Sequence, residues 1–411
     1  MKKVLLLLLI APVVGFGQYV FNTKEELQTA VDLWTSNETS ALEQYGEINT
    51  WDVSNITDMS YLFYNRNTFN QDIGSWDTSN VTNMQGMFRG SFTFNQYINR
   101  WDTGQVTDMS SMFYGAHAFN SKLDRWDTLN VTNMSSMFYG ARNFNQDIGD
   151  WNTKFVTDMS YMFYGALSFD QFLGIWDTGE VTDMSSMFYE TPVSNLGINY
   201  WDTSNVTDMS AMFYDTSGFV TELDRWDTSN VINMSSMFRG SAFNQDISSW
   251  DVSNVTDMSR MFNDAGYFNQ DIGNLDVSSV TEMDYMFDGA IRFNQNISSW
   301  CVANINSEPV NFSNNSPLIE NHKPVWGTCP TASIDDQNQL NISIYPNPTS
   351  SLLALNSDKE YDIEVYDMAG NKVMALTGNS INMEHLSTAT YIVKATDKSS
   401  NEELTYKVVK N

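Results

Sequence analysis

Residues 126–150 read WDTLNVTNMSSMFYGARNFNQDIGD, and close variants of this unit recur from Trp51 to Ser299. The period is 25 residues, apart from one unit of 24 residues that begins at Trp226. Trp opens every unit except the last full one, where Leu275 takes its place. A fixed period of this size indicates a repeat solenoid, in which each coil buries its apolar side chains against its neighbours. Such a fold predicts a long regular surface rather than one deep catalytic pocket.

The order of residues within the unit suggests the structure of each coil. Val131 begins a short extended piece that is rich in β-branched residues. Met134, Met137 and Phe138 then have the i, i+3, i+4 spacing of one helix face. Gly140 suits the left-handed position that follows a helix. We therefore expect a short strand plus a short helix in each 25-residue coil.

Two segments precede the repeats. Residues 1–17 combine two lysines, an apolar run and a small-residue site, which is typical of a secretory signal peptide. Residues 18–50 contain a capping box from Thr23 to Glu26, followed by apolar residues at helical spacing. This segment predicts an N-terminal helical cap over the open end of the repeats.

The ten-unit repeat is expected to span residues 51–300, and residues 301–339 read as a proline-rich cap and linker. Cys301 and Cys329 are the only cysteines in the chain. In an exported protein they favour one disulfide bond over two free thiols or a two-cysteine metal site. Residues 340–411 alternate apolar residues with turn signals, which predicts a small all-β sandwich.

Composition argues against several functional classes. The formal net charge is -29 and the pI is about 4.1, so a nucleic acid is a poor partner. No stretch after the leader is long and apolar enough to predict a transmembrane span in the mature chain. The three histidines, His117, His322 and His385, lie in different regions, and no catalytic triad can be placed. We therefore do not expect an enzyme.

An aspartate follows the opening Trp in most units and forms one column along the repeat. The column includes Asp102, Asp127, Asp177, Asp202 and Asp227. Such side chains commonly accept hydrogen bonds from nearby backbone N–H groups and so stabilise turns. The alternative is that adjacent carboxylates bind Ca²⁺, the one possible cofactor that the sequence suggests.

A second column consists of the tyrosines that follow the Met-Phe pair. Its central members are Tyr114, Tyr139, Tyr164, Tyr189 and Tyr214. Charged residues replace Tyr in other units, which indicates a position that faces solvent. A row of exposed tyrosines could stack on sugar rings or contact a partner protein. The alternative is that the rings only cover the flank of the core.

Two resemblances to known families extend these predictions. The pattern WDTSNVTDMS at 201–210, with FNQDIS at 243–248, resembles the repeats of BspA-like leucine-rich-repeat surface proteins. This resemblance implies a leucine-rich-repeat-like solenoid in a secreted or surface-displayed adhesin. The segments IYPNPT at 344–349 and VYDMAG at 365–370 are similar to the type IX secretion sorting domain. That resemblance implies export through the type IX secretion machinery to the outer cell surface.

We therefore expect a secreted, cell-surface-attached, adhesin-like protein that recognises a protein or glycan macromolecule through a repetitive face. Many weak contacts along such a face would supply the affinity. The alternative is a structural component of a surface layer or biofilm that associates with itself.

Overall fold

The computed structural model describes residues 18–194, 196–330, 343–357, 359–398 and 403–411. Contacts divide the chain into two compact units, which end at Cys329 and Asn411. The predicted signal peptide and most of the predicted linker lie outside the described residues.

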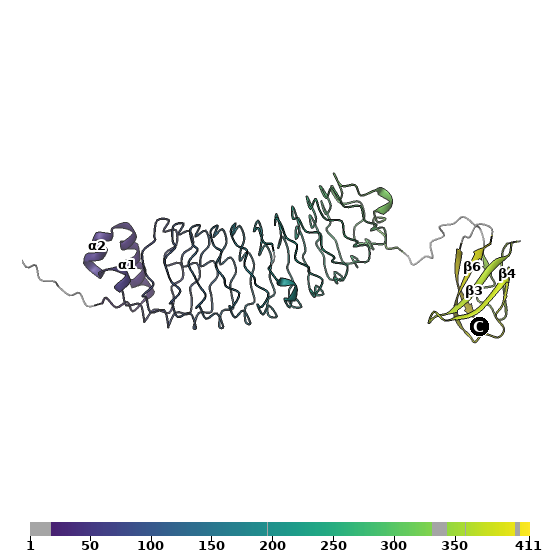
Figure 1. Cartoon of the computed structure of the whole chain (residues 1–411), viewed down its shortest axis with the longest axis horizontal. Helices are drawn as coiled ribbons and strands as arrows, with labels where there is room; N and C mark the ends of the chain where they lie inside the picture. The colour runs from purple at the N-terminus through teal and green to yellow at the C-terminus, as the bar shows by residue number, and fades with distance from the viewer. Residues whose placement is uncertain (1–17, 195, 331–342, 358, 399–402) are drawn as a thin grey trace, which may run out of the picture. The chain divides into compact units, whose positions relative to one another are not determined.

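Two helices cover the first coil of the repeat (Figure 1). Helix α1 (Lys24–Ser36) begins after Thr23, whose side chain accepts a hydrogen bond from the backbone N–H of Glu26 at 3.2 Å. Helix α2 (Glu38–Tyr45) follows at once and was not predicted. Trp34 on α1 meets the ring of Trp51 edge-on, with centroids 5.7 Å apart, so the cap closes the apolar end of the stack.

The predicted strand-plus-helix coil is wrong, and with it the leucine-rich-repeat-like fold class. The described residues from Trp51 to Trp300 contain turns, single-residue parallel bridges and one 3-10 helix, η2 (Ile198–Tyr200), but no α-helix or multi-residue strand. Ser136 lies in the middle of the expected helix and has φ +55°. A left-handed residue interrupts a right-handed helix. The equivalent residue has a positive φ in every unit: Tyr61, Gly86, Ser111, Ser136, Tyr161, Ser186, Ala211, Ser236, Arg260 and Tyr285.

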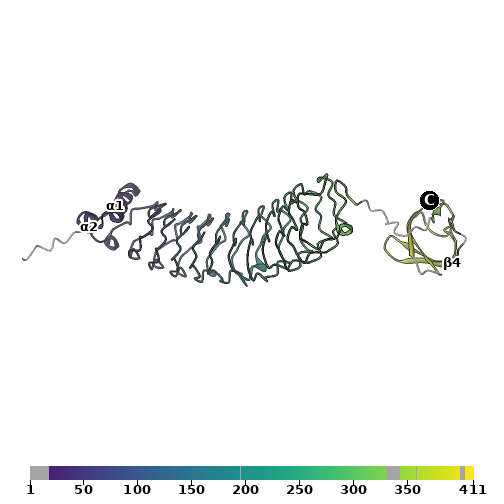
Figure 2. The same ribbon diagram turned by 90° about the horizontal axis from the view of Figure 1, so that it is seen from above.

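The backbone hydrogen bonds of the coil run in two alternating directions. The N–H groups of Met134, Ser136 and Phe138 donate to the next coil, as from Ser136 to the carbonyl oxygen of Ser160 at 2.8 Å. Between them, Met137 donates back to Met134 within its own coil at 3.2 Å. This alternation satisfies the buried backbone groups without a helix and joins each coil to its neighbour in parallel. Figure 2 shows the resulting stack of coils from above.

The predicted interior residues are buried in every coil. Phe138 stacks on Phe113 of the preceding coil, with ring centroids 5.6 Å apart. The indole N–H of Trp126 donates to the carbonyl oxygen of Ile98, 28 residues earlier, at 3.1 Å. The same bond is made by Trp76, Trp101, Trp151, Trp176, Trp201, Trp226 and Trp300. Trp therefore contributes apolar area and also satisfies a buried carbonyl group.

The last coil extends beyond the predicted boundary at residue 300. Phe287 donates its backbone N–H to Phe312, and Val302 donates to Thr328, each at 2.8 Å, as between regular coils. The ring of Trp326 meets Phe312 edge-on at 4.9 Å. Residues up to Cys329 thus form a further, degenerate coil, which includes the 3-10 helix η3 (Glu320–His322).

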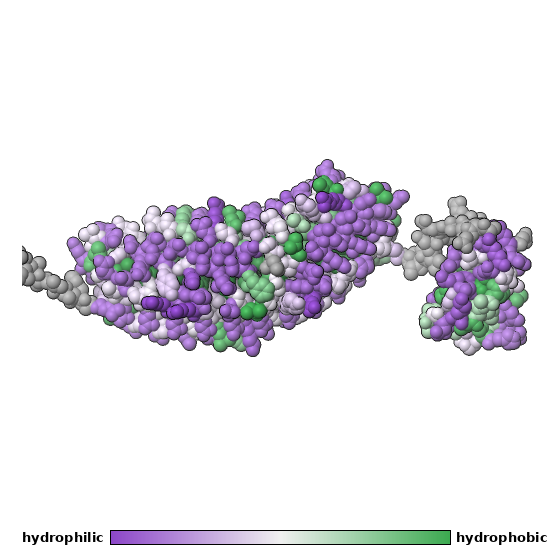
Figure 3. Space-filling view, in the orientation of Figure 1, coloured by the Kyte–Doolittle hydropathy of each residue, from purple (hydrophilic) through white to green (hydrophobic). Residues whose placement is uncertain are grey.

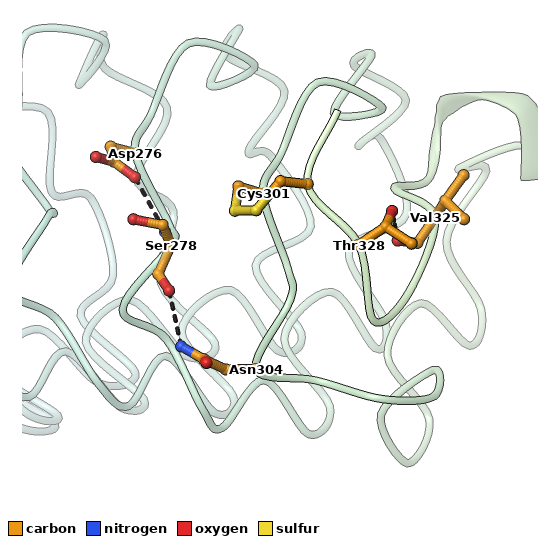
Figure 4. Close-up of a disulfide and its surroundings, with 7 residues drawn as sticks. Asp276, Ser278, Cys301, Asn304, Val325 and Thr328 are labelled. Carbon is orange, nitrogen blue, oxygen red and sulfur yellow. Dashed lines mark hydrogen bonds between the residues drawn. A yellow bond between two sulfur atoms is a disulfide. The ribbon is translucent and has the colours of Figure 1, made fainter. Parts of the chain in front are cut away.

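The predicted disulfide between Cys301 and Cys329 is confirmed and joins the two ends of this last coil. Figure 4 shows Ser278 of the preceding coil between two polar neighbours. Its backbone N–H donates to Asp276, and its carbonyl oxygen accepts from the side chain of Asn304 at 2.8 Å. Backbone bonds and the disulfide together hold the last coil against the stack.

The C-terminal unit contains two antiparallel sheets. One sheet has the order β1-β2-β5 and the other has the order β4-β3-β6-β7. The strands are β1 (Ile344–Tyr345), β2 (Leu352–Leu355), β3 (Tyr361–Asp367), β4 (Lys372–Gly378), β5 (Ser380–Asn382), β6 (Ala389–Asp397) and β7 (Glu403–Lys410). Leu353, Ile363 and Val393 from both sheets share one buried core.

Replacing Trp126 by Phe should lower the free energy of unfolding by about 1–3 kcal/mol, because the buried carbonyl of Ile98 loses its donor. Leu275→Trp is the reciprocal variant, since it restores the residue that the other units carry. Thermal melts should show a lower midpoint for the first variant and a midpoint no lower than wild type for the second. An unchanged midpoint for Trp126→Phe would contradict this role of the indole N–H.

Replacing both cysteines by Ser should destabilise the last coil by about 3–4 kcal/mol, because the disulfide closes a loop of 28 residues. Limited proteolysis should then cut the variant first within residues 302–328. A reducing agent should sensitise the wild type to the same cuts and leave the variant unchanged. Equal resistance of both reduced and oxidised proteins would contradict this prediction.

Candidate ligand-binding groove

The five predicted tyrosines form one continuous stack of rings. The centroids of Tyr114 and Tyr139 lie 4.2 Å apart, and the following distances are 4.3, 4.2 and 4.1 Å up to Tyr214. Neighbouring ring planes differ by 13° or less. All five side chains are half-buried. We call this row the tyrosine stack.

A guanidinium group covers each end of the tyrosine stack. Arg89 lies 4.2 Å from the ring centroid of Tyr114, and Arg239 lies 5.0 Å from that of Tyr214. These arginines occupy the tyrosine position of their own coils. They therefore continue the row through cation–π contacts where the tyrosines stop.

Glycines lie beside the first half of the tyrosine stack. The residue after each stack position is Gly90, Gly115, Gly140 and Gly165 in four successive coils. All four have a positive φ, between 62° and 74°, which glycine adopts at little cost. A Cβ on Gly140 would lie 3.9 Å from the Cα of Gly115 and one on Gly165 equally far from the Cα of Gly140, so only backbone adjoins these two glycines. Gly90 and Gly115 are buried, with the side chains of Asn65 and Phe92 beside them. We call these four residues the glycine floor.

A second wall rises on the other side of the glycine floor. It consists of Phe92, His117, Arg142 and Leu167, each three residues after a stack position. Phe92 and His117 lie ring over ring with centroids 4.7 Å apart. Burial lowers the pKa of His117, and the nearby charge of Arg142 lowers it further. The His117 side chain is therefore neutral at physiological pH.

The two walls and the floor enclose a groove of about 520 Å³. This volume lies within the range of about 300–1,000 Å³ that is usual for ligand sites. The groove includes Tyr114, Tyr139 and Tyr164 but not the rest of the tyrosine stack. The structure therefore divides the predicted tyrosine row into a part inside the groove and a part beyond it.

Side chains close the groove at both ends. Asn65 and Glu190 occupy the glycine position in the coils before and after the four-glycine run. Both have a positive φ, 55° and 52° respectively. Asn tolerates this conformation better than most residues, whereas Glu rarely adopts it. Glu190 therefore interrupts the floor at an energetic cost.

The tyrosine rings present their edges and hydroxyl groups rather than their faces. Tyr139, Tyr164 and Tyr189 are covered on both faces by neighbouring rings, so a sugar could not stack on them. Burial raises the pKa of Tyr139 and of Tyr189, and the adjacent tyrosines raise both further. These hydroxyl groups therefore stay protonated and can donate hydrogen bonds over the physiological pH range.

The predicted Asp column stabilises turns. Asp102 accepts from the backbone N–H of Gly104 at 3.0 Å, and Asp127 accepts from Leu129 at the same distance. Equivalent bonds are made by Asp177, Asp202 and Asp227. Within the part of the chain that the structure describes, no group of three His, Cys, Asp or Glu could hold a metal ion. The geometry thus favours turn stabilisation, and calcium binding stays a prediction.

The glycine floor, the second wall and the role of Glu190 at the end of the groove were not predicted from the sequence. The four glycines recur at the 25-residue period, and Asn65 and Glu190 interrupt that run. This regularity was the available signal, because a repeated glycine without a side chain predicts a hollow beside its neighbours. The second wall offered no such signal, since its four members differ in chemistry.

The repeats match the family model described as "Mycoplasma protein of unknown function, DUF285" over residues 33–130, 119–225 and 208–324. Together these matches cover more than half of the chain. The chain belongs to this family. All the groove residues of this DUF285 protein lie within the matched ranges. The finer resemblance to BspA-like surface proteins stays a prediction.

A second model, described as "Secretion system C-terminal sorting domain", matches residues 343–411. This DUF285 protein is therefore secreted and reaches the outer cell surface, and its tail interacts with the type IX secretion machinery. None of the helices among the described residues is long and apolar enough to cross a bilayer. Neither the curated proteins nor the solved structures include a match to the chain.

Asp183 lies in a second carboxylate column, between Asp158 and Asp208. Burial raises its pKa, and the two neighbouring carboxylates raise it further, although bonds from Ser185 oppose the shift. A carboxyl group whose pKa is higher in the folded state than in the unfolded state destabilises the fold when it is ionised. This cost disappears as the pH falls through the folded-state pKa and is absent below the unfolded value.

Replacing Asp183 by Asn should therefore raise the melting temperature at pH 7, and the gain should vanish at about pH 3. Asn already occupies this column at 133, where it accepts from the backbone N–H of Ser135 at 2.9 Å, so the turn bond can persist. Melting curves from pH 3 to pH 8 would measure the difference between variant and wild type. A gain that is the same at every pH would contradict the electrostatic explanation.

Proposed function

We propose that this protein is a cell-surface binding protein that holds a macromolecular ligand in the groove and catalyses no reaction. The observation that carries the proposal is the run of four glycines between two side-chain walls. A floor of glycines flanked by aromatic, apolar and cationic side chains allows a ligand to approach the backbone closely, most directly at Gly140 and Gly165. Export to the cell surface supports the proposal, because it places such a groove where external macromolecules are accessible.

The one face of the molecule that Figure 3 shows agrees with this choice of site. On the face shown in Figure 3, hydrophilic residues predominate and hydrophobic residues occur singly or in small groups. Scattered apolar residues of this kind need no partner. The groove instead combines hydrogen-bond donors, aromatic edges and a glycine floor in one place.

Filling the floor should abolish binding. In Gly140→Asp, the new side chain would enter the groove, while the backbone should tolerate it because Asp215 and Asp264 have positive φ at the same position. Gly218→Asp is the matched control, since Gly218 also has a positive φ and has no heavy atom within 4 Å of the added Cβ. It adds the same charge outside the groove.

The test is a screen of the purified full chain against arrayed glycans and immobilised matrix proteins, with both variants in parallel. We expect a ligand that binds the wild type and Gly218→Asp equally and binds Gly140→Asp at least about tenfold more weakly. A ligand that binds Gly140→Asp as well as the wild type would place the binding site elsewhere. The absence of any ligand for the wild type would refute the proposed function.

Removing the Glu190 side chain, which closes one end of the groove, gives an independent prediction. Glu190→Gly should relieve the strain of a left-handed Glu and extend the floor by one coil, to the ring of Tyr189, because Asp215 occupies the next floor position. Long ligands should then bind more tightly than to the wild type, whereas ligands that fill only the original groove should not. Titration with a length series of the identified ligand would measure this, and equal affinity at every length would contradict it.

A second function, self-association, is favoured by one observation. Phe172, Ile175 and Tyr200 lie in adjacent coils with 56%, 66% and 70% of their surfaces exposed. Large exposed apolar residues that lie together can mark an interface. Light scattering over a concentration series should then show growth that Ile175→Ser reduces, and a monomer at every concentration would exclude this function.

A further inference from the structure

The lining of the groove is unlike the rest of the chain in charge. The chain as a whole carries a net charge of -29. The groove instead contains the guanidinium groups of Arg89 and Arg142, and its one acidic residue, Glu190, lies at the end opposite Asn65. At physiological ionic strength charges farther away than about 8 Å are largely screened. The lining of the groove itself therefore contributes two positive charges and one negative charge at short range.

The uncharged part of the lining also favours an electron-rich ligand. The edge of an aromatic ring carries a partial positive charge, and the tyrosine stack directs ring edges outward. The Tyr139 hydroxyl remains protonated, since burial and its neighbours raise its pKa. The tyrosine wall thus offers donors and positive edges to oxygen acceptors.

The two arginines are too far apart to hold one small anion together. Arg89 belongs to the second coil and Arg142 to the fourth, so about 10 Å separates them along the stack. They also lie on opposite walls of the groove. Arg142 is exposed, and among the described residues it forms no ion pair. This placement suits a chain that carries several anionic groups along its length.

The floor disfavours a peptide as that chain. The N–H groups of Gly115 and Gly140 already donate to Tyr139 and Tyr164 of the next coils, each at 2.6 Å. An extended peptide would therefore find no free N–H donor on these two glycines, so its own carbonyl groups would lack the backbone partners that strand addition provides. A polyuronate has no amide backbone, and its hydroxyl groups can donate to or accept from the two walls.

We infer that the groove binds a linear acidic polysaccharide whose carboxylates pair with Arg89 and Arg142. This inference rests on the proposed function and specifies the ligand of the same site. Polar groups on the two walls form hydrogen bonds with the sugar hydroxyl groups. The glycine floor lets the polysaccharide lie close to the protein backbone. Glu190 repels the carboxylates of the polysaccharide at its end of the groove. The bound segment is therefore limited to the four coils of the glycine floor.

The probe for this inference is a linear polyuronate oligosaccharide, compared with its methyl ester, which has the same backbone without charge. Calorimetric titration of the full chain at about 0.15 M salt keeps the long-range repulsion screened. We expect the acid form to bind at least about tenfold more tightly than the ester. Charge-assisted bonds of this kind correspond to about tenfold to hundredfold in affinity.

Three variants distinguish the groove from other cationic surfaces. Arg142→Gln should weaken binding of the acid form by about tenfold or more and leave binding of the ester unchanged. Glu190→Gln should strengthen binding of the acid form. Arg292→Gln is the matched control, because Arg292 lies over Tyr267 outside the groove and should have no effect.

Three results would overturn the inference, and a fourth would overturn it while leaving the proposed function intact. Equal binding of acid and ester, or no effect of Arg142→Gln, would overturn the inference. So would polyglutamate that binds as tightly as the polyuronate with the same dependence on Arg142, since the occupant would then be an acidic peptide. If the polyuronate fails but another ligand binds in a manner sensitive to Gly140→Asp, the inference falls and the proposed function stands.

Discussion

The backbone hydrogen bonds between successive coils are the interaction on which the rest of the structure depends. Ser136 bonds to Ser160 and Gly140 bonds to Tyr164, so each coil is completed by its neighbour. These bonds and the parallel bridges, which pair residues one repeat apart, place the residues of each coil over their equivalents in the next coil. The aromatic rings of successive coils therefore stack on one another in the core, and the glycines of the glycine floor lie next to one another. The groove is a direct consequence of this register.

The interior of the fold could be predicted from the sequence, but the path of the backbone could not. The 25-residue period was sufficient to place Trp126, Phe138 and Phe144 in the core. The i, i+3, i+4 spacing of Met134, Met137 and Phe138 suggested a helix, yet a series of turns buries the same residues. Serine has no strong preference for the left-handed conformation that Ser136 adopts, so its identity gave no warning.

The candidate site was predicted in part for a similar reason. Periodicity identified the tyrosine row, but only the structure shows that its ring faces are covered and that the groove ends at Glu190, before the last two rings of the stack. Gly140 was interpreted as the end of a helix, although its role is to leave the groove floor bare. The second wall is recognisable only in three dimensions, because register alone brings Phe92, His117 and Arg142 together.

If one continuous groove, bounded by the register of the coils, binds the ligand, the tyrosines inside it should respond to binding and those beyond it should not. The most direct measurement is nuclear magnetic resonance of the full chain with isotope-labelled tyrosine rings, before and after addition of the ligand that the binding screen identifies. We expect the ring signals of Tyr114, Tyr139 and Tyr164 to shift and that of Tyr214, which lies beyond Glu190, to change little. Equal shifts along the whole tyrosine stack, or shifts confined to Tyr214, would contradict it.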